Sequence, residues 1–344
     1  MHVTLIVPAP FSTVSGGYEY DRRIAEGLRA LGHDVTISEL AGRHPLVDEV
    51  ARDSACAAWD RAAAGTHVVI DGLALPAFAG LDDALAARSV TALIHHPTAS
   101  ETGLDDAVRA PLMAAEKRLF GRMARLIVTS EPTRDHVASD FGVPMEKMTV
   151  VVPGTDDAPR CTGSGCATCE ILSVGTLVPR KGHDLLLRAL ARLFDLDWRL
   201  TIAGSPDRDP VHAHGLIALA EELGISGHVR FAGEVTGEAL ETLWRGADLF
   251  ALATHFEGYG MAVAESLKRG IPVVVTAGGA AGTLVPFEAG LVCPPGDRDQ
   301  LSKSLRRAIF GTELRREMAD NAWRAGRDLP DWTTQAGLFA SAIA

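Results

Sequence analysis

Short apolar runs rich in β-branched residues alternate along this chain with segments whose apolar positions recur every three or four residues. This alternation predicts buried strands joined by helices, and therefore parallel sheets built from βαβ units. In the first half we expect strands at Val3–Val7, Val35–Glu39, His67–Ile70, Val90–Ile94, Leu126–Thr129 and Met148–Val152. In the second half we expect them at Ile171–Val174, Arg199–Ala203, Val229–Ala232, Leu249–Ala253, Pro272–Val275 and Gly290–Val292.

The two sets of strands are separated by Pro153–Cys169, a segment rich in Gly, Pro, Ser and Thr that is typical of a linker. The pattern therefore predicts an α/β fold with two doubly wound, Rossmann-like domains facing across a cleft. We expect the domains at residues 1–155 and 170–330, with a linker at 156–169. Residues 331–344 show a short helical pattern that could pack back on the N-terminal domain. Ligands of such sheets bind beyond the carboxyl ends of the strands, so we expect the functional residues in the loops that follow the strands.

Composition and charge narrow the class of protein. The chain has 344 residues, of which 47% are hydrophobic, and a formal net charge of −11, which disfavours a general nucleic-acid binder. The first apolar run is too short for a signal peptide and no run of about 18 apolar residues occurs, so we expect a cytoplasmic protein. The mixture of basic and apolar residues at Leu112–Leu126 would permit membrane docking, but the acidic residues around it argue against this.

Three of the five cysteines are clustered as Cys161, Cys166 and Cys169. This C-x4-C-x2-C spacing permits an iron–sulfur or zinc site, whose fourth ligand would have to be remote, such as Cys293. No histidine lies nearby, and reduced thiols in a variable linker are the simpler interpretation. We therefore expect no metal.

A basic pair follows the first predicted strand of the second half. Arg180 and Lys181 lie in Gly175–Asp184, directly before a predicted helix at Leu185–Leu193. Cations are disfavoured at a helix N-terminus, whereas an anion bound there would meet the backbone amides and both side chains. The pair therefore indicates a phosphate or diphosphate site, unless it belongs to an exposed basic loop.

Two glutamates frame the exit of another strand in the second half. Glu257 lies in the strand's exit loop, and Glu265 lies in the helix predicted at Met261–Lys268. The backbone between them, which could approach a ligand closely, comprises Gly258, Tyr259, Gly260 and Met261. Buried carboxylates need hydrogen-bond donors, and sugar or ribose hydroxyls are suitable ones. The structural alternatives are a buried ion pair for Glu265 and a helix N-terminal acid for Glu257.

This combination resembles the retaining glycosyltransferases of family 4, which have the GT-B fold. The resemblance covers nearly the whole chain and is most specific in the second half. The matching elements are Gly175–Gly182, the Glu-x7-Glu element at 257–265, Gly233-Glu-Val before Ala247-Asp248-Leu249, Pro294-Pro-Gly-Asp297, and Thr129-Ser-Glu-x-Thr133 with Pro153-Gly-Thr.

The resemblance implies roles for these residues. Arg180 and Lys181 would neutralise the diphosphate of a sugar nucleotide, and Glu265 would bind the ribose hydroxyls. Glu257 would hold hydroxyls of the transferred sugar, helped by amides at 258–261. Because two cations and a helix start can stabilise the leaving group, the resemblance implies no metal and no cofactor.

The first half contributes further candidates. Gly16 and Gly17 lie between the first strand and a helix predicted at Tyr18–Leu31, where a loop could approach a diphosphate, although such a pair is often only a turn.

His95 and His96 end a strand, and the resemblance favours His95 as the histidine that faces the donor sugar; a core or capping histidine is the alternative. Asp71 and Glu101, at the predicted cleft edge, could contact the acceptor or be solvated loop acids.

We therefore predict a retaining hexosyltransferase that moves a sugar from a nucleoside-diphosphate sugar, with UDP-hexose as the commonest donor of the family, to an unidentified hydroxyl acceptor. The alternatives are a GT-B sugar-nucleotide epimerase or phosphorylase, or a non-catalytic protein that binds sugar nucleotides. The motifs do not identify the acceptor.

Overall fold

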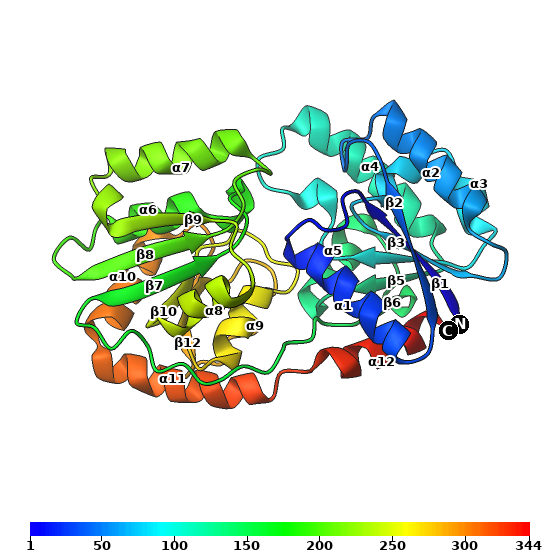
Figure 1. The fold of residues 1–344 in the computed structure, drawn as a ribbon. Coiled ribbons are helices and arrows are strands. Elements are labelled where there is room, and N and C mark those ends of the chain that lie inside the picture. Colours follow the sequence, from blue (N-terminus) through cyan, green and yellow to red (C-terminus); the bar gives the residue numbers. More distant parts are fainter. The chain divides into compact units, whose positions relative to one another are not determined.

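The computed structural model describes all residues from Met1 to Ala344. The chain divides into two compact units (Figure 1). The N-terminal unit comprises Met1–Gly154 together with Pro330–Ala344, and the C-terminal unit comprises Thr155–Leu329. Each unit is built around its own parallel sheet of six strands.

The sheet of the N-terminal unit has the strand order β2-β1-β3-β4-β5-β6. Its strands are β1 His2–Pro8, β2 Asp34–Leu40, β3 His67–Asp71, β4 Val90–Ile94, β5 Arg125–Val128 and β6 Met148–Val150. Its α-helices are α1 Gly16–Ala30, α2 Glu49–Arg61, α3 Asp82–Ala86, α4 Asp106–Arg122, α5 Glu131–Phe141 and α12 Trp332–Ile343. Short 3₁₀ turns are η1 Leu75–Phe78, η2 Thr98–Ser100 and η3 Met145–Lys147.

The sheet of the C-terminal unit has the order β12-β11-β10-β7-β8-β9. Its strands are β7 Cys169–Val174, β8 Trp198–Ala203, β9 Val229–Gly233, β10 Leu249–Leu252, β11 Val273–Thr276 and β12 Gly290–Cys293. Its α-helices are α6 His183–Leu190, α7 Pro210–Glu222, α8 Gly237–Arg245, α9 Met261–Lys268, α10 Arg298–Phe310 and α11 Thr312–Arg327, with 3₁₀ turns η4 Pro179–Lys181 and η5 Ser226–His228.

The predicted strands and the doubly wound class are confirmed, with strand ends within two residues of those expected. Helix boundaries were predicted less well. Helix α1 begins at Gly16 rather than Tyr18, because Ser15 is extended and its side chain accepts from the amide of Tyr18. The two glycines therefore form the first turn of the helix instead of a separate loop.

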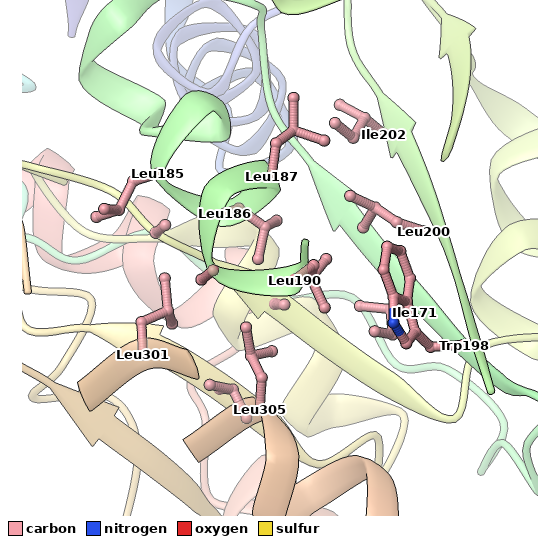
Figure 2. Close-up of a cluster of buried hydrophobic side chains, with 14 of the residues drawn as sticks. Ile171, Leu185, Leu186, Leu187, Leu190, Trp198, Leu200, Ile202, Leu301 and Leu305 are labelled. Atoms are coloured by element: carbon pink, nitrogen blue, oxygen red, sulfur yellow. The ribbon is translucent and has the colours of Figure 1, made fainter. Parts of the chain in front are cut away.

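The core of the C-terminal unit buries the apolar face of α6 (Figure 2). Leu186 and Leu190 are fully buried, and α6 packs both on the sheet and on α10, from which Leu301 and Leu305 reach the same cluster. The helix ends at Leu190, three residues before the predicted end. The chain then turns, and the carbonyl of Leu193 accepts a hydrogen bond from the buried indole of Trp198 at 3.1 Å.

The last helix of the chain belongs to the N-terminal unit. Helix α12 packs on α1, and Phe339 is 1% exposed within the apolar cluster that this pair shares with the sheet. The ring of Trp332 contacts the Tyr20 ring edge-on, with centroids 5.9 Å apart. Arg125 donates to the carbonyl of Ala342 at 2.7 Å, which ties the helix to the start of β5.

The linker is attached to the C-terminal unit by hydrogen bonds. Asp248 accepts from the amide of Ser164 at 2.9 Å and from its hydroxyl at 2.7 Å. The clustered cysteines are separated by burial: Cys166 is exposed, Cys161 is half-buried, and Cys169 is buried at the start of β7.

The basic segment Leu112–Leu126 is divided between two elements. Helix α4 ends at Arg122, and Leu126 lies buried in strand β5, so Leu112–Leu126 is not one amphipathic helix. None of the helices combines the length and the apolar character that a membrane crossing requires.

Candidate functional site

The strand order of the C-terminal unit brings two exit loops together. Strands β7 and β10 are neighbours although they are far apart in the sequence, and the chain winds outward from them in opposite directions. Ligands of doubly wound sheets bind at such a switch point, beyond the carboxyl ends of the two strands. The carbonyl of Arg180, after β7, accepts from the amide of His255 at 2.8 Å and from the hydroxyl of Thr254 at 3.0 Å, both after β10.

Three predicted site residues meet at this switch point. The ammonium of Lys181 lies 2.7 Å from Oε1 of Glu257, and Nη1 of Arg180 lies 3.4 Å from the same oxygen. Arg180 also donates to the carbonyl of Phe256 at 2.7 Å. The three charged side chains are between 9% and 15% exposed, so their charges interact with little screening by water.

The protonation state of Glu257 follows from this arrangement. Burial by itself would raise the pKa of its carboxyl group, but the charges of Lys181 and Arg180 and the hydrogen bonds from Lys181 and Thr254 outweigh burial and lower it. Glu257 therefore supplies part of the counter-charge that we expected from a bound anion.

The backbone holds Glu257 firmly while leaving part of its carboxylate for a ligand. Its amide donates to the carbonyl of Gly278 at 3.0 Å, and its carbonyl accepts from the amide of Ala280 at 2.8 Å. The contacts from Lys181, Arg180 and Thr254 all converge on Oε1. Oε2 accepts no hydrogen bond from the protein and is not buried, so it can accept one from a hydroxyl group.

The helix after Glu257 begins without a side-chain cap. Helix α9 starts at Met261, and Gly260 before it has φ = 105°, a conformation that favours glycine. Uncapped amides in a first helical turn are suited to bind an anion or a sugar oxygen. Tyr259 is buried, which raises its pKa to about 12. Glu265 lies half-buried in the second turn of the same helix.

A buried histidine directly follows the basic pair. His183 is the first residue of α6 and is 1% exposed, and neither ring nitrogen has a hydrogen-bond partner. Burial and the neighbouring charge of Lys181 lower its pKa from 6.5 to about 3, so the ring is neutral. Gly182, at φ = 63°, makes the turn that brings this helix against the end of β10.

The N-terminal unit has a switch point of its own, between β1 and β3. Helix α1 begins after β1 with Gly16 and Gly17, and β3 ends at Asp71. A Cβ on Gly17 would lie 3.2 Å from the ring of His95, which follows β4. The glycine therefore allows the histidine to pack closely against the first turn of α1.

His95 lies between two buried carboxylates. Its Nε2 is 3.0 Å from Oδ1 of Asp21 and 3.3 Å from Oδ2 of Asp71, and these acids are 2% and 6% exposed. One oxygen of each acid and a ring nitrogen of His95 lie within 4.8 Å of one another, so the three groups form one cluster of interacting charges. His96 pairs with Glu101 at 3.1 Å, so the two histidines contact different acids.

The sequence analysis missed three residues of these sites: Asp21, Thr254 and His183. Asp21 could have been noticed, because it stands on the apolar face of α1 with Ile24 and Leu28, where an acid is unusual. No local signal distinguishes Thr254 or His183, whose roles depend on contacts between loops.

The fold resembles that of solved glycosyltransferases. A sucrose-phosphate synthase from Thermosynechococcus elongatus has a TM-score of 0.84 at 20% identity, with 99% of this chain and 97% of that chain covered. Anabaena HepE, solved in complex with UDP-glucose, has a TM-score of 0.79 at 18% identity, with 100% and 99% covered. The chain therefore has the GT-B fold that the sequence predicted.

The sequence comparisons find relatives of the C-terminal unit. Residues 168–324 match the family described as glycosyl transferases group 1. Over 181 residues the chain is 34% identical to a protein named D-inositol 3-phosphate glycosyltransferase from Mycobacterium sp. (strain KMS). That match covers 49% of this chain and 41% of the relative, so the chain spans less than half of the relative's length.

Proposed function

We propose that this protein is a retaining glycosyltransferase that moves a sugar from a nucleoside-diphosphate sugar to a hydroxyl acceptor. The observation that carries the proposal is the cluster of Lys181, Arg180 and Glu257 at the switch point of a domain that matches glycosyl transferases group 1. The two cations can interact with a diphosphate, and the carboxylate of Glu257 can accept a hydrogen bond from a sugar hydroxyl.

The donor class follows from the chemistry of the cluster. Lys181 and Arg180 would face the diphosphate, and the uncapped start of α9 would add backbone amides at Met261. Glu257 would accept hydroxyls of the transferred sugar, and Glu265 those of the ribose. UDP-hexose is the first donor to test, because the similarly folded HepE was solved with UDP-glucose.

The proposed reaction breaks the bond between the anomeric carbon and the diphosphate oxygen, and its electron pair leaves with the diphosphate. The acceptor oxygen bonds to the same face of the sugar and transfers its proton to the departing phosphate oxygen. Lys181 and Arg180 stabilise the negative charge that grows on the leaving group, more strongly in the transition state than in the bound donor. Because these cations can serve as counter-charge, we propose that no divalent metal is required.

The acceptor is proposed at the level of a chemical class. The named relative acts on D-inositol 3-phosphate, which makes a phosphorylated polyol the first acceptor to try. The other acceptors to test are lipid-linked sugars, the ends of polysaccharides and small soluble metabolites.

The proposal is tested by a donor screen followed by turnover. Thermal shifts of the full chain with UDP, GDP and ADP sugars identify the donor, since a ligand at 100 times its Kd stabilises by about 2.7 kcal/mol. Product analysis by NMR then reports the anomeric configuration. Glu257→Gln and Lys181→Gln should abolish transfer, whereas Lys303→Gln, which removes an exposed lysine of α10, should leave it intact.

Each alternative outcome has a distinct meaning. Epimerised donor without free nucleoside diphosphate would identify an epimerase, and tight binding without turnover across the panel would identify a binding protein. Full transfer by Glu257→Gln, or an inverted product, would overturn the assignment of the site or of the stereochemistry. Loss of activity in EDTA that Mg²⁺ or Mn²⁺ restores would overturn the metal-independent mechanism.

A further inference from the structure

An acid stands on the buried face of the first helix. Asp21 is 1% exposed in α1, next to the fully buried Tyr20 and one turn before Ile24. A buried carboxylate is costly unless a charged or hydrogen-bonding partner compensates it. Here the partner is His95, which is 74 residues away in the sequence and lies 3.0 Å from the acid.

Both carboxylates contact the same nitrogen of His95. Oδ1 of Asp21 and Oδ2 of Asp71 lie 3.0 Å and 3.3 Å from Nε2. With both carboxyl groups ionised, a lone pair on Nε2 would face two acceptor oxygens, so this nitrogen carries the proton. Asp71 is itself anchored, because its Oδ1 accepts from the amide of Leu73 at 2.8 Å.

Three further contacts hold His95 in place, two at its ring and one at its backbone. Gly17 of α1 lies against one edge, where only a residue without a Cβ avoids a contact of 3.2 Å. The ring of Tyr20 packs edge-on with centroids 5.2 Å apart. The hydroxyl of Thr129, after β5, donates to the carbonyl of His95 at 3.1 Å. With Nε2 clamped, Nδ1 is the remaining polar atom of the ring; it has no partner in the protein and is not buried.

We propose that Asp21 is a positioning residue that, together with Asp71, clamps the Nε2–H of His95 and holds the imidazole as a cation, so that Nδ1–H is presented as a donor to a ligand oxygen. The class of ligand oxygen, a sugar hydroxyl or a phosphate, rests on the proposed function. The clamp itself does not, because it can be measured without substrate.

The charges around the ring support the cationic state. Burial lowers the pKa of His95, but Asp21 and Asp71 outweigh it and raise the pKa well above its ordinary value. Burial raises the pKa of Asp21, against the charge of His95, while Asp71 raises it further and Arg22 lowers it. Arg22 is held by Glu19 at 2.9 Å and by two backbone carbonyls. A histidine that keeps its proton across the neutral range serves as a hydrogen-bond donor and is excluded as a general base.

The clamp can be measured by NMR titration of the full chain with labelled histidine. The signal of His95 is assigned by its loss in His95→Gln. In the wild type the ring should remain a cation to about pH 9, and in Asp21→Asn its midpoint should fall by about one pH unit or more. Asp34→Asn, which removes the acid paired with the exposed His2 at 2.9 Å, is the matched control and should leave His95 unchanged.

Two results would overturn the proposal. A wild-type His95 that titrates near neutrality would show that the ring is not held as a cation, and this measurement needs no variant to fold. An unchanged midpoint in folded Asp21→Asn would show that Asp21 does not act on His95.

Kinetics add a readout that a structural role would not produce. In Asp21→Asn, kcat should fall about tenfold for each pH unit above the lowered midpoint, while the wild type keeps its activity over that range. A loss that is the same at every pH would contradict a role through the charge of His95. If the wild type shows no turnover with any donor, the proposed function fails, and the NMR titration still decides the clamp.

Discussion

His183 allows a quantitative test of the structure of the C-terminal unit. The ring is buried with both nitrogens unpaired, next to Lys181, and its pKa is lowered from 6.5 to about 3. The folded protein therefore excludes a proton that the unfolded chain binds below about pH 6.5. Stability should be unaffected by this residue above that pH and should be lost as the pH falls from 6.5 toward 3. His183→Leu should remove this loss.

The size of the effect follows from the two pKa values. Each pH unit between them contributes about 1.4 kcal/mol, so at about pH 5 the wild type should lose about 2 kcal/mol through His183 alone. At about pH 7.5 the contribution is close to zero. There His183→Leu should be neutral or stabilising, because it replaces two unsatisfied buried nitrogens with an apolar side chain of similar volume.

Urea unfolding followed by tryptophan fluorescence can measure this difference, since Trp198 and Trp244 are fully buried in the C-terminal unit. Hydrogen exchange of the amides of β7 and β8 would assign the change to that unit. His214→Leu, which removes an exposed histidine of α7, is the control and should retain the wild-type dependence. If His183→Leu and the wild type lose the same free energy between about pH 7.5 and pH 5, the reasoning is refuted.

Three further substitutions test packing. Gly204→Ala should destabilise the C-terminal unit by about 2 kcal/mol or more, because its Cβ would overlap the carbonyl oxygen of Gly175. Gly215→Ala, with open space around it in the interior of α7, should instead stabilise by about 0.5–1 kcal/mol. Phe339→Ala should destabilise the N-terminal unit by about 3–5 kcal/mol, because it leaves a cavity between α12 and the sheet. Urea unfolding measures all three changes in free energy.

Each of these predictions can be contradicted by comparing the variant with a control variant. Equal effects of Gly204→Ala and Gly215→Ala would show that the close approach of the loops after β7 and β8 does not constrain the fold. For Phe339→Ala, the exposed Leu338 on the same helix provides the control. A loss for Leu338→Ala as large as that for Phe339→Ala would show that α12 does not pack as described.

Much of the fold was predictable because its signals are local. Buried parallel strands appear in the sequence as short runs of β-branched residues. The predicted ends of all strands therefore lie within two residues of the observed ends. Helix ends were less certain because they depend on capping. Ser15 starts α1 two residues early, and the turn closed by the Trp198 indole ends α6 three residues early.

Three of the predicted site residues, Arg180, Lys181 and Glu257, lie together in the structure, but the contacts between them were not predicted. The glycines, the basic pair and the two glutamates were identified from their types and from their places after strands. The sequence analysis assigned Glu257 to a sugar and Lys181 to a diphosphate, and it did not predict that the two would pair. Their hydrogen bond at 2.7 Å spans 76 residues and exists because the strand order makes β7 and β10 neighbours.

The sequence by itself determined the class of the sheets and pointed to the loops where we expect chemistry, because alternation of strand and helix and the residues after each strand are local properties. Only the tertiary structure decided which charges neutralise one another. Burial and distance set those interactions, and both depend on strand order and helix packing. The clearest case is Asp21, an acid that in the sequence interrupts an apolar stripe and that the fold places 3.0 Å from His95.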